Sequence, residues 1–178
     1  MMVFISGGAK NGKSYFAQKL TKEMSEEHKV PLYYIATMIP GDEEDEARIK
    51  RHIKDREGWG FTTLEVPRNI SSSLEDEGVN PKGAFLLDSV TATLANEMFR
   101  DGEFFSDAAE RVASDLLLFG SKTGNVVYVS DYIYNDFPGE DKYTEAYRKG
   151  LAYVDRKLAE ACHQVIEITA GVPIIHKG

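Results

Sequence analysis

Short apolar runs alternate along this chain with longer stretches in which apolar residues recur every three or four positions. The runs are nearly continuous in Val, Ile, Leu and aromatic residues, which is typical of strands buried on both faces of a parallel sheet. The stretches between them have the period of amphipathic helices. Predicted strands cover residues 3–5, 32–37, 61–66, 84–88, 126–130 and 165–169, and predicted helices residues 13–28, 90–100, 106–119 and 141–162. This order predicts an α/β fold with helices on both faces of a mostly parallel sheet.

Two of the helices have a defined apolar face. That face consists of Tyr15, Phe16, Leu20 and Met24 in the first helix, and of Tyr143, Tyr147, Leu151, Val154 and Leu158 in the last. After a break at Gly171, residues 172–175 predict an edge strand, because an edge position tolerates Pro173. Residues 68–83, rich in Ser, Asn, Gly and Pro, predict a short helix or turn followed by a surface connection.

The composition favours one compact domain, covering residues 1–178. A hydrophobic content of 42% in 178 residues supplies one sizeable core and no evident material for a second. The formal net charge of −8 argues against a nucleic-acid-binding or anionic-membrane-binding surface, which needs clustered Lys and Arg. Any phosphate group must therefore be bound by a local cluster of donors.

The cysteine content and the absence of long apolar segments indicate the compartment. The single Cys162 has no partner for an internal disulfide, which favours a reducing environment, and we expect an ordinary thiol at a helix end. The N-terminus lacks a basic region followed by an apolar stretch, and no eighteen apolar residues run together. We therefore expect a cytoplasmic protein without a membrane anchor.

The stretch between the first predicted strand and the first predicted helix fits the pattern G-x-x-x-x-G-K-[ST]. Glycines allow such a loop to direct successive backbone N–H groups at phosphate oxygens, and the following helix adds its positive dipole end. The alternative is a glycine turn with a chance lysine. The predicted nucleotide-binding residues are Gly7, Gly8, Ala9, Lys10, Asn11, Gly12, Lys13 and Ser14, with Lys13 also catalytic through the β- and γ-phosphates.

Two residues are candidate Mg²⁺ ligands. The hydroxyl of Ser14, in the loop, supplies one oxygen. Asp88 ends the apolar strand 84–88, the usual place of the second Mg²⁺-organising acid in enzymes with such a loop. An apolar run ending in Asp is common, so the assignment of Asp88 depends on the loop. A P-loop NTPase-like, three-layer fold is the corresponding fold prediction.

A charged helix is predicted after Pro40 and Gly41. It starts in the acidic run 42–46, which suits the positive end of a helix dipole, with metal binding as the less favoured interpretation. A spacing of four places Arg48, His52 and Arg56 on one face, where they could bind a triphosphate. From the spacing alone, a surface histidine is the simpler interpretation of His52.

Aromatic and acidic residues follow the strand 126–130. The segment 131–139 begins with Asp131 and Tyr132 at the carboxyl end of a predicted strand. Open α/β sheets bind ligands at that edge, so the segment is either a packed loop or a substrate contact.

Several of these segments, in this order, resemble the adenosylcobinamide kinase/adenosylcobinamide-phosphate guanylyltransferase family of cobalamin biosynthesis. The glycine-rich start matches, and so does Y-I-A-T at residues 34–37. Further matches are R-I-x-x-H-x-x-x-R at 48–56, T-x-E at 63–65, D-x-x-T-x-x-L-x-N at 88–96 and A-G-x-P at 170–173. One loop motif is common to many enzymes, whereas this succession is specific.

The resemblance implies two reactions and a set of site residues. His52 corresponds to the family's histidine that attacks the α-phosphate of GTP, giving a guanylyl-histidine whose GMP passes to adenosylcobinamide phosphate. The kinase reaction transfers a γ-phosphoryl group from ATP or GTP to the aminopropanol hydroxyl of adenosylcobinamide, with Mg²⁺ as cofactor. Lys54 and Arg56 would neutralise phosphate charge, while Ala36, Thr37, Met38 and Glu65 would contact the guanine nucleotide. The family also implies a homo-oligomer, commonly a trimer.

The chain departs from the family pattern at three places. Glu57 takes the position of a usual proline, and Phe61 that of a usual tryptophan, with Trp59 displaced. The strand 126–130 is followed by Asp131 and Tyr132 instead of N-E-V-G. Residues 155–156 are Asp and Arg where N-Q is typical. These departures leave two other hypotheses: a diverged kinase with another small-molecule acceptor, and a non-catalytic protein that senses a nucleotide.

Overall fold

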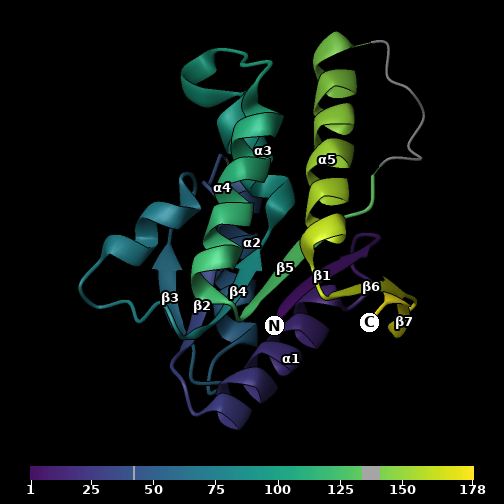
Figure 1. The fold of residues 1–178 in the computed structure, drawn as a ribbon. Helices are drawn as coiled ribbons and strands as arrows, with labels where there is room; N and C mark the ends of the chain where they lie inside the picture. The colour runs from purple at the N-terminus through teal and green to yellow at the C-terminus, as the bar shows by residue number, and fades with distance from the viewer. Residues whose placement is uncertain (42, 134–140) are drawn as a thin grey trace.

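The fold is built on one seven-stranded sheet with the order β3-β2-β4-β5-β1-β6-β7 (Figure 1). The computed structural model describes residues 1–41, 43–133 and 141–178, with the backbone alone at 44, 45, 48 and 55. β7 pairs antiparallel with β6, and the other neighbouring pairs are parallel. The predicted mostly parallel sheet with a C-terminal edge strand is confirmed. The strands are β1 (Met2–Gly7), β2 (Leu32–Ala36), β3 (Thr62–Glu65), β4 (Ala84–Asp88), β5 (Val126–Asp131), β6 (Gln164–Thr169) and β7 (Val172–Lys177).

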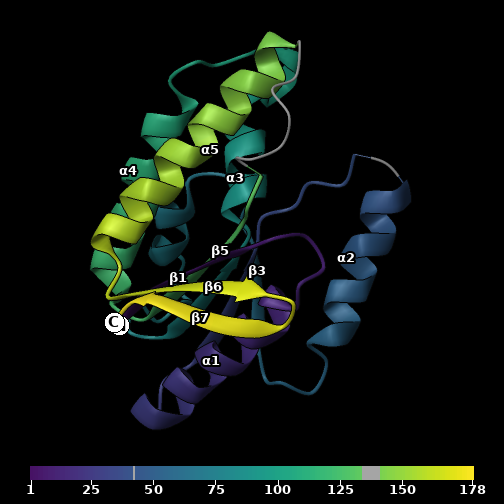
Figure 2. The same ribbon diagram turned by 90° about the vertical axis from the view of Figure 1, so that its right-hand side faces the viewer.

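Helices cover both faces of the sheet, as predicted. α1 lies on one face, and α3, α4 and α5 lie on the other (Figure 2). Two short 3₁₀ segments, η1 (Ile70–Glu75) and η2 (Arg100–Gly102), lie between β3 and β4 and between α3 and α4. The helices are α1 (Lys13–His28), α2 (Glu43–Asp55), α3 (Val90–Met98), α4 (Ala108–Thr123) and α5 (Lys142–Ala161).

Two apolar cores, one on each face of the sheet, explain why the strand sequences are continuously apolar. Successive side chains of β4 point to opposite faces, so Phe85 and Leu87 enter the core beneath α3, α4 and α5, while Leu86 enters the core beneath α1. β1 divides in the same way, with Phe4 in the first core and Ile5 in the second. Each strand therefore needs an apolar residue at almost every position.

The predicted apolar faces of α1 and α5 are each wrong at one tyrosine. Tyr15 is 65% exposed, and α1 instead buries its small residue Ala17 with Met24 against the sheet. Tyr143 is 42% exposed near the start of α5, whereas Leu151 and Val154 are fully buried farther along. Helical spacing identified the correct side of each helix, but both tyrosines lie in the first turn, beyond the edge of the core.

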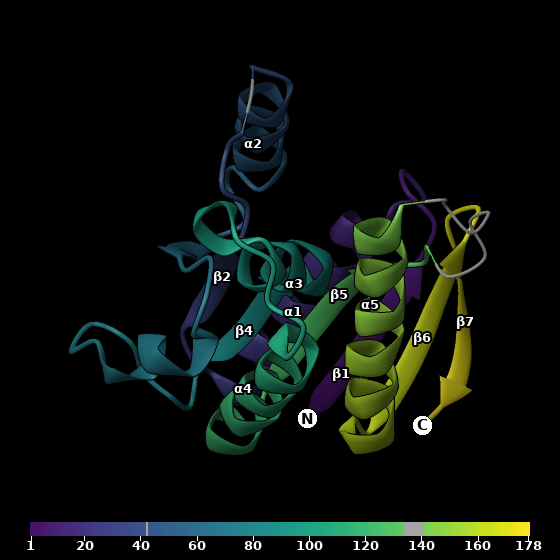
Figure 3. The same ribbon diagram turned by 90° about the horizontal axis from the view of Figure 1, so that it is seen from above.

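α2 stands apart from the layered body of the protein (Figures 2 and 3). It is connected through the segments that follow β2 and precede β3, and none of its described side chains belongs to either core. Its sequence is strongly charged, which suits a helix that does not cover the sheet. Within the described residues, no helix combines the length and apolar character needed to cross a bilayer.

Candidate nucleotide-binding site

Two glycines allow the loop between β1 and α1 to adopt its conformation. A Cβ atom on Gly7 would lie 2.4 Å from the carbonyl oxygen of Ile168, so only glycine allows β6 to approach the loop this closely. Gly12 has a φ of 84°, in the left-handed region that favours glycine, and caps the start of α1. The loop begins on β1, is packed against β6, and leads directly into a helix N-terminus.

Lys13 is buried and already paired. Its ammonium group donates to the Gly8 carbonyl oxygen at 2.7 Å and lies 3.0 Å from a carboxylate oxygen of Asp131. The side chain of Lys13 is 6% exposed and that of Asp131 25%. A buried ammonium group needs such a partner, since an unpaired charge is costly away from water. The pair therefore holds the lysine at the loop.

The start of α1 provides donors rather than acceptors. Its first turn contains no acidic residue, and the Gly12 cap has no side chain to occupy the free N–H groups. Unpaired N–H groups and the positive dipole end favour an anion at this position. At the loop tip, Ala9 and Lys10 are exposed, while the Asn11 amide donates to the Ile168 carbonyl at 3.4 Å. Phosphate binding by residues 7–14 remains a prediction that fits this geometry.

Asp88 lies at the carboxyl end of β4, two strands from the loop. Its carboxylate accepts a hydrogen bond from the Tyr34 hydroxyl at 3.1 Å. β5 separates β4 from β1, so Asp88 and the loop strand are about 10 Å apart across the sheet. Among the described residues, no three His, Cys, Asp or Glu side chains gather to hold a metal ion. A Mg²⁺ ion near Ser14 and Asp88 would thus need phosphate and water ligands as well, which suits its coordination chemistry.

The turn after β2 is held from inside the fold. The Thr37 hydroxyl accepts from the Ser89 backbone N–H at 2.8 Å, and the Thr37 carbonyl oxygen accepts from the Asn96 amide at 2.7 Å. Thr37 is completely buried, whereas Ala36 and Met38 are half-buried and Glu65 is exposed. The side chain of Thr37 therefore shapes the turn. Any contact with a nucleotide there would be made by Ala36 or Met38.

Arg56 fastens the end of α2 to the sheet. Its guanidinium carbon lies 4.2 Å from the centre of the Tyr34 ring, and two of its nitrogens donate to the Thr63 hydroxyl at 3.3 and 3.2 Å. Tyr34 in turn bonds Asp88, so Arg56 is within two contacts of the predicted metal ligand. The stacked guanidinium provides a fixed positive charge at this edge of the sheet.

His52 lies on α2, one helical turn before Arg56. The residue is half-buried, and its Nδ1 atom is shielded from solvent without a hydrogen-bond partner among the described residues. Lys54 is exposed. α2 stands apart from the body of the protein (Figure 3), and the hydrogen bonds among the described residues include none between His52 and the loop. The Arg48 side chain of the predicted cationic face lies outside the described part of the structure. The same holds for Asp42 of the acidic run and for residues 134–139 of the predicted substrate segment.

An open cavity of about 840 Å³ lies between α5 and the sheet. It begins one residue from the loop at Ser6, and Tyr132 and Asp155 line it as well. The Ser130 hydroxyl donates to Asp155 at 2.8 Å, while the other Asp155 oxygen and the Ser6 hydroxyl are buried without a hydrogen-bond partner in the described part of the chain. Burial raises the pKa of the Asp155 carboxyl well above its usual value; the bond from Ser130 opposes this, and the nearby Asp131 charge adds to it.

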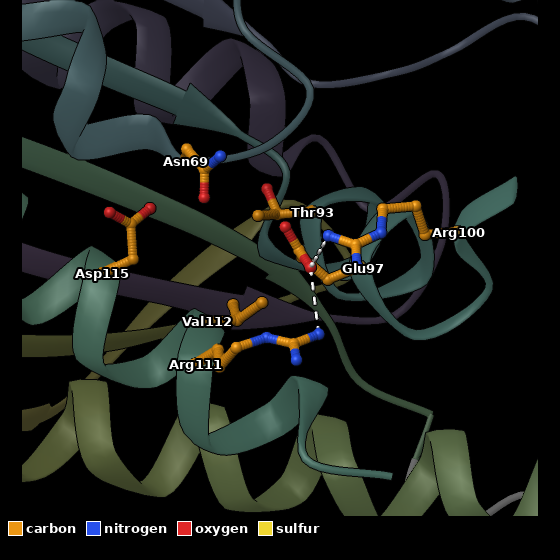
Figure 4. Close-up of a pocket in the computed structure, with 7 residues that line it drawn as sticks. All are labelled: Asn69, Thr93, Glu97, Arg100, Arg111, Val112 and Asp115. Carbon is orange, nitrogen blue, oxygen red and sulfur yellow. Dashed lines mark hydrogen bonds and ion pairs between the residues drawn. The ribbon is translucent and has the colours of Figure 1, made fainter. Parts of the chain in front are cut away.

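A smaller cavity of about 170 Å³ lies between α3, α4 and Asn69 (Figure 4). Glu97 faces two arginines there, at 3.8 Å from Arg100 and 3.2 Å from Arg111. Asp115 accepts the backbone N–H of Ile70 at 2.6 Å. These charges satisfy one another, so the cluster joins α3, α4 and η1 and is separate from the loop.

Sequence reasoning missed the role of Asp131 beside Lys13. It placed Asp131 in a segment that was either packing or substrate contact, because Lys13 is 118 positions away in the chain. The register of the sheet pairs Gly7 with Asp131 and so brings the carboxylate to the loop. The Asp131 backbone N–H also donates to the Thr91 hydroxyl at 2.9 Å, which fixes this end of β5. A parallel pairing of 126–130 with 3–5 would have been the only available signal.

The fold is that of P-loop NTPases, with the loop motif at residues 7–14 between β1 and α1. Solved structures of that kind resemble it: the ATPase domain of G40P has a TM-score of 0.54 at 12% identity, covering 93% of this chain and 68% of that one. A KaiC-like protein from Pyrococcus horikoshii has a TM-score of 0.54 at 13% identity, covering 99% and 78%. At these identities the likeness concerns the fold alone.

The family model for cobinamide kinase / cobinamide phosphate guanyltransferase matches residues 3–175, and the chain belongs to this family of transferases. The bifunctional adenosylcobalamin biosynthesis protein CobP of Pseudomonas aeruginosa is 28% identical over 178 residues, covering 100% of this chain and 98% of the relative. The corresponding protein CobU of Escherichia coli is 27% identical over 186 residues, covering 98% of each. The predicted family is confirmed.

Proposed function

We propose that this single-domain protein carries out both reactions for which its family is named. It phosphorylates the aminopropanol hydroxyl of adenosylcobinamide, using ATP or GTP, and transfers GMP from GTP to the resulting phosphate. The observation that carries this proposal is the match over residues 3–175, together with a complete phosphate-binding loop. The substrates are a corrinoid and a nucleoside triphosphate.

In the guanylyl transfer, a lone pair of His52 attacks the α-phosphorus of GTP. The P–N bond forms as the bond to the bridging oxygen breaks, and pyrophosphate leaves. A phosphate oxygen of the acceptor then attacks the same phosphorus and releases the histidine, so one difficult step becomes two easier ones. Nδ1 is shielded from solvent, which favours Nε2 as the attacking nitrogen. Lys54 and Arg56 follow His52 by two and four positions and neutralise phosphate charge.

In the kinase reaction the chain mainly positions the phosphates and balances their charge. Backbone N–H groups of residues 7–14 hold the phosphate tail, and Lys13 moves its charge from Asp131 to the β- and γ-oxygens. Ser14, and Asp88 through water, would hold a Mg²⁺ ion, which would neutralise phosphate charge there. Ala36, Met38 and Glu65 lie at the carboxyl edge of the adjoining strands and contact the nucleoside. The Thr37 side chain shapes the turn between them.

The guanylyl transfer requires His52 to meet the α-phosphate, so α2 must move as the nucleotide binds. Arg56 stays attached to Tyr34 and Thr63 and acts as the fixed end of that movement. Gly58 and Gly60, with φ of 79° and 88°, turn the chain directly after it. A pivot at Arg56 needs only the rest of α2 to approach the loop.

Incubation with α-labelled GTP and Mg²⁺ tests the transferase proposal. We expect the protein to retain label that is stable to alkali and lost in acid, as a phosphorus–nitrogen bond requires, and His52→Ala to retain none. His28→Ala, at an exposed histidine on α1, is the matched control and keeps the label. Phosphoryl transfer to a small-molecule acceptor other than cobinamide, without labelled protein, would favour a diverged kinase. Nucleotide binding with neither reaction would indicate a sensor.

A further inference from the structure

An exposed aromatic side chain lies immediately after the phosphate-binding loop. Tyr15 follows Ser14 in the first turn of α1, and its side chain is 65% exposed. The rest of that helix face is charged, with Lys19 and Lys22 following at the spacing of a helix face. This large exposed ring belongs to neither core.

Trp59 braces this tyrosine. The two ring centres are 5.6 Å apart with the planes at 89°, an edge-to-face contact, and the Lys22 ammonium lies 5.7 Å from the centre of the Trp59 ring. Trp59 stands between Gly58 and Gly60, whose left-handed backbone turns the chain here. The Trp59 ring therefore lies along α1 between Tyr15 and Lys22 and restricts the orientation of the tyrosine.

The position of Tyr15 along a bound nucleotide follows from the loop. In the proposed complex, residues 7–14 surround the phosphate tail, and the chain leaves the phosphates at Ser14. The ribose and base continue from the α-phosphate, so they emerge where Tyr15 begins. A flat ring that is open to solvent and held at an angle by a second ring suits stacking with a purine, because every base has an apolar face.

We propose that Tyr15, braced by Trp59, is a stacking platform for the purine base of the nucleotide bound at the loop. The inference rests on the proposed function for the presence of a nucleotide there, and it deepens that function by naming a base-binding residue. Stacking accepts guanine and adenine alike, so the platform adds affinity for purine nucleotides, while discrimination between GTP and ATP is left to other contacts.

Trp59 is the chain's single tryptophan and reports directly on this platform. Fluorescence titrations with GTP, ATP and inorganic tripolyphosphate, each with Mg²⁺, provide the test, with binding followed in parallel by calorimetry. We expect both nucleotides to change the Trp59 emission and tripolyphosphate to bind without changing it. Tyr15→Ala should weaken GTP binding about tenfold and leave tripolyphosphate binding unchanged, whereas Tyr15→Phe should bind GTP as the unaltered protein does.

Tyr143→Ala is the matched control, since it removes another exposed tyrosine, on α5, and leaves GTP binding unchanged. Equal GTP affinity in Tyr15→Ala and the unaltered protein would overturn the platform, as would an equal loss of GTP and tripolyphosphate affinity. The two proposals fail separately. Labelling of His52 with unchanged GTP affinity in Tyr15→Ala overturns only the platform, and a Tyr15-dependent affinity without labelling overturns only the transferase.

Discussion

At the scale of single residues, the contact between Lys13 and Asp131 holds the lysine at the loop. The lysine is buried 3.0 Å from a carboxylate, so the charge that should meet a phosphate is already balanced by the protein. In the proposed complex, a nucleotide would therefore replace Asp131 as the counter-charge of Lys13. The stability of the free protein and that of its nucleotide complex then depend differently on Asp131.

Asp131→Asn separates these two dependences. The free protein should lose about 1–2 kcal/mol of unfolding free energy, less than for a fully buried pair because Asp131 is partly exposed. With saturating GTP and Mg²⁺ the loss should shrink, since phosphate supplies the missing charge. Thermal unfolding with and without nucleotide measures both. Asp101→Asn, at an exposed carboxylate beside Arg100, is the control and should leave both melting temperatures unchanged.

Asp155 gives the protein a pH-dependent stability. Its pKa is raised in the folded state, so an unfolded chain releases this proton at a lower pH than the folded one does. Ionisation of Asp155 therefore favours the unfolded chain, and the folded protein loses stability as the pH rises from the unfolded-state pKa of Asp155 to its folded-state pKa. Asp155→Asn removes this loss while keeping an acceptor for Ser130. At pH 8 we expect the unfolding free energy of the variant to be higher by about 1 kcal/mol or more, and at pH 4 nearly unchanged. Each kcal/mol raises the melting temperature of a protein of this size by roughly 2–4 °C.

The control for Asp155→Asn is a substitution at a carboxylate that is exposed to solvent. Asp76→Asn, at an exposed position, should leave the pH profile of the melting temperature unchanged. A gain for Asp155→Asn that is the same at pH 4 and pH 8 would mean that the buried carboxyl does not carry the dependence.

At the scale of elements, α2 differs from the other helices because it lies outside both cores. Its described side chains bury no apolar surface against the sheet, so its backbone opens at low cost. The proposed chemistry requires this freedom, since His52 has to reach a phosphate held by another element.

Hydrogen exchange should reveal this freedom. We expect the amides of α2 to exchange much faster than those of α3, and to slow when GTP and Mg²⁺ bind, because the closed arrangement packs the helix. α3, which is packed on the sheet in both states, serves as the internal reference. Protection of α2 equal to that of α3 without nucleotide would contradict the pivot at Arg56.

Most of this fold was predictable at the element scale. Continuous apolar runs such as β4 identified strands covered on both faces, and the motif at residues 7–14 fixed where the loop begins. Periodicity could not tell that α2 leaves the body, because an amphipathic pattern does not say what its face meets. It also could not pair Lys13 with Asp131, since that contact depends on which strands are neighbours. The roles of His52 and Glu65 still depend on the resemblance alone.

At the scale of the whole molecule, one end of the sheet is less covered than the other. β7 has all six residues exposed, among them Val172, Ile174 and Ile175, and the 840 Å³ cavity lies next to it under α5. Exposed edge strands with apolar side chains favour association. The family resemblance implies a homo-oligomer, and this end of the sheet has the surface for one.

Light scattering of the purified protein tests the association. We expect a mass three times that of the chain, and a lower mass for Ile174→Lys, which places a charge on the exposed strand. Lys157→Glu, a charge change at a partly exposed lysine of α5, is the control and should keep the higher mass. A mass equal to one chain at micromolar concentration would contradict the expectation.

The insertion of β5 between the loop strand and the Asp88 strand has a consequence for how such enzymes diversify. In the proposed kinase reaction, an acceptor alcohol would approach the γ-phosphate over the end of β5, where Asp131 begins the segment that departs from the family pattern. The nucleotide would be recognised from the strands on either side. Changes after β5 could then redirect the protein to a new acceptor while its nucleotide chemistry stays intact.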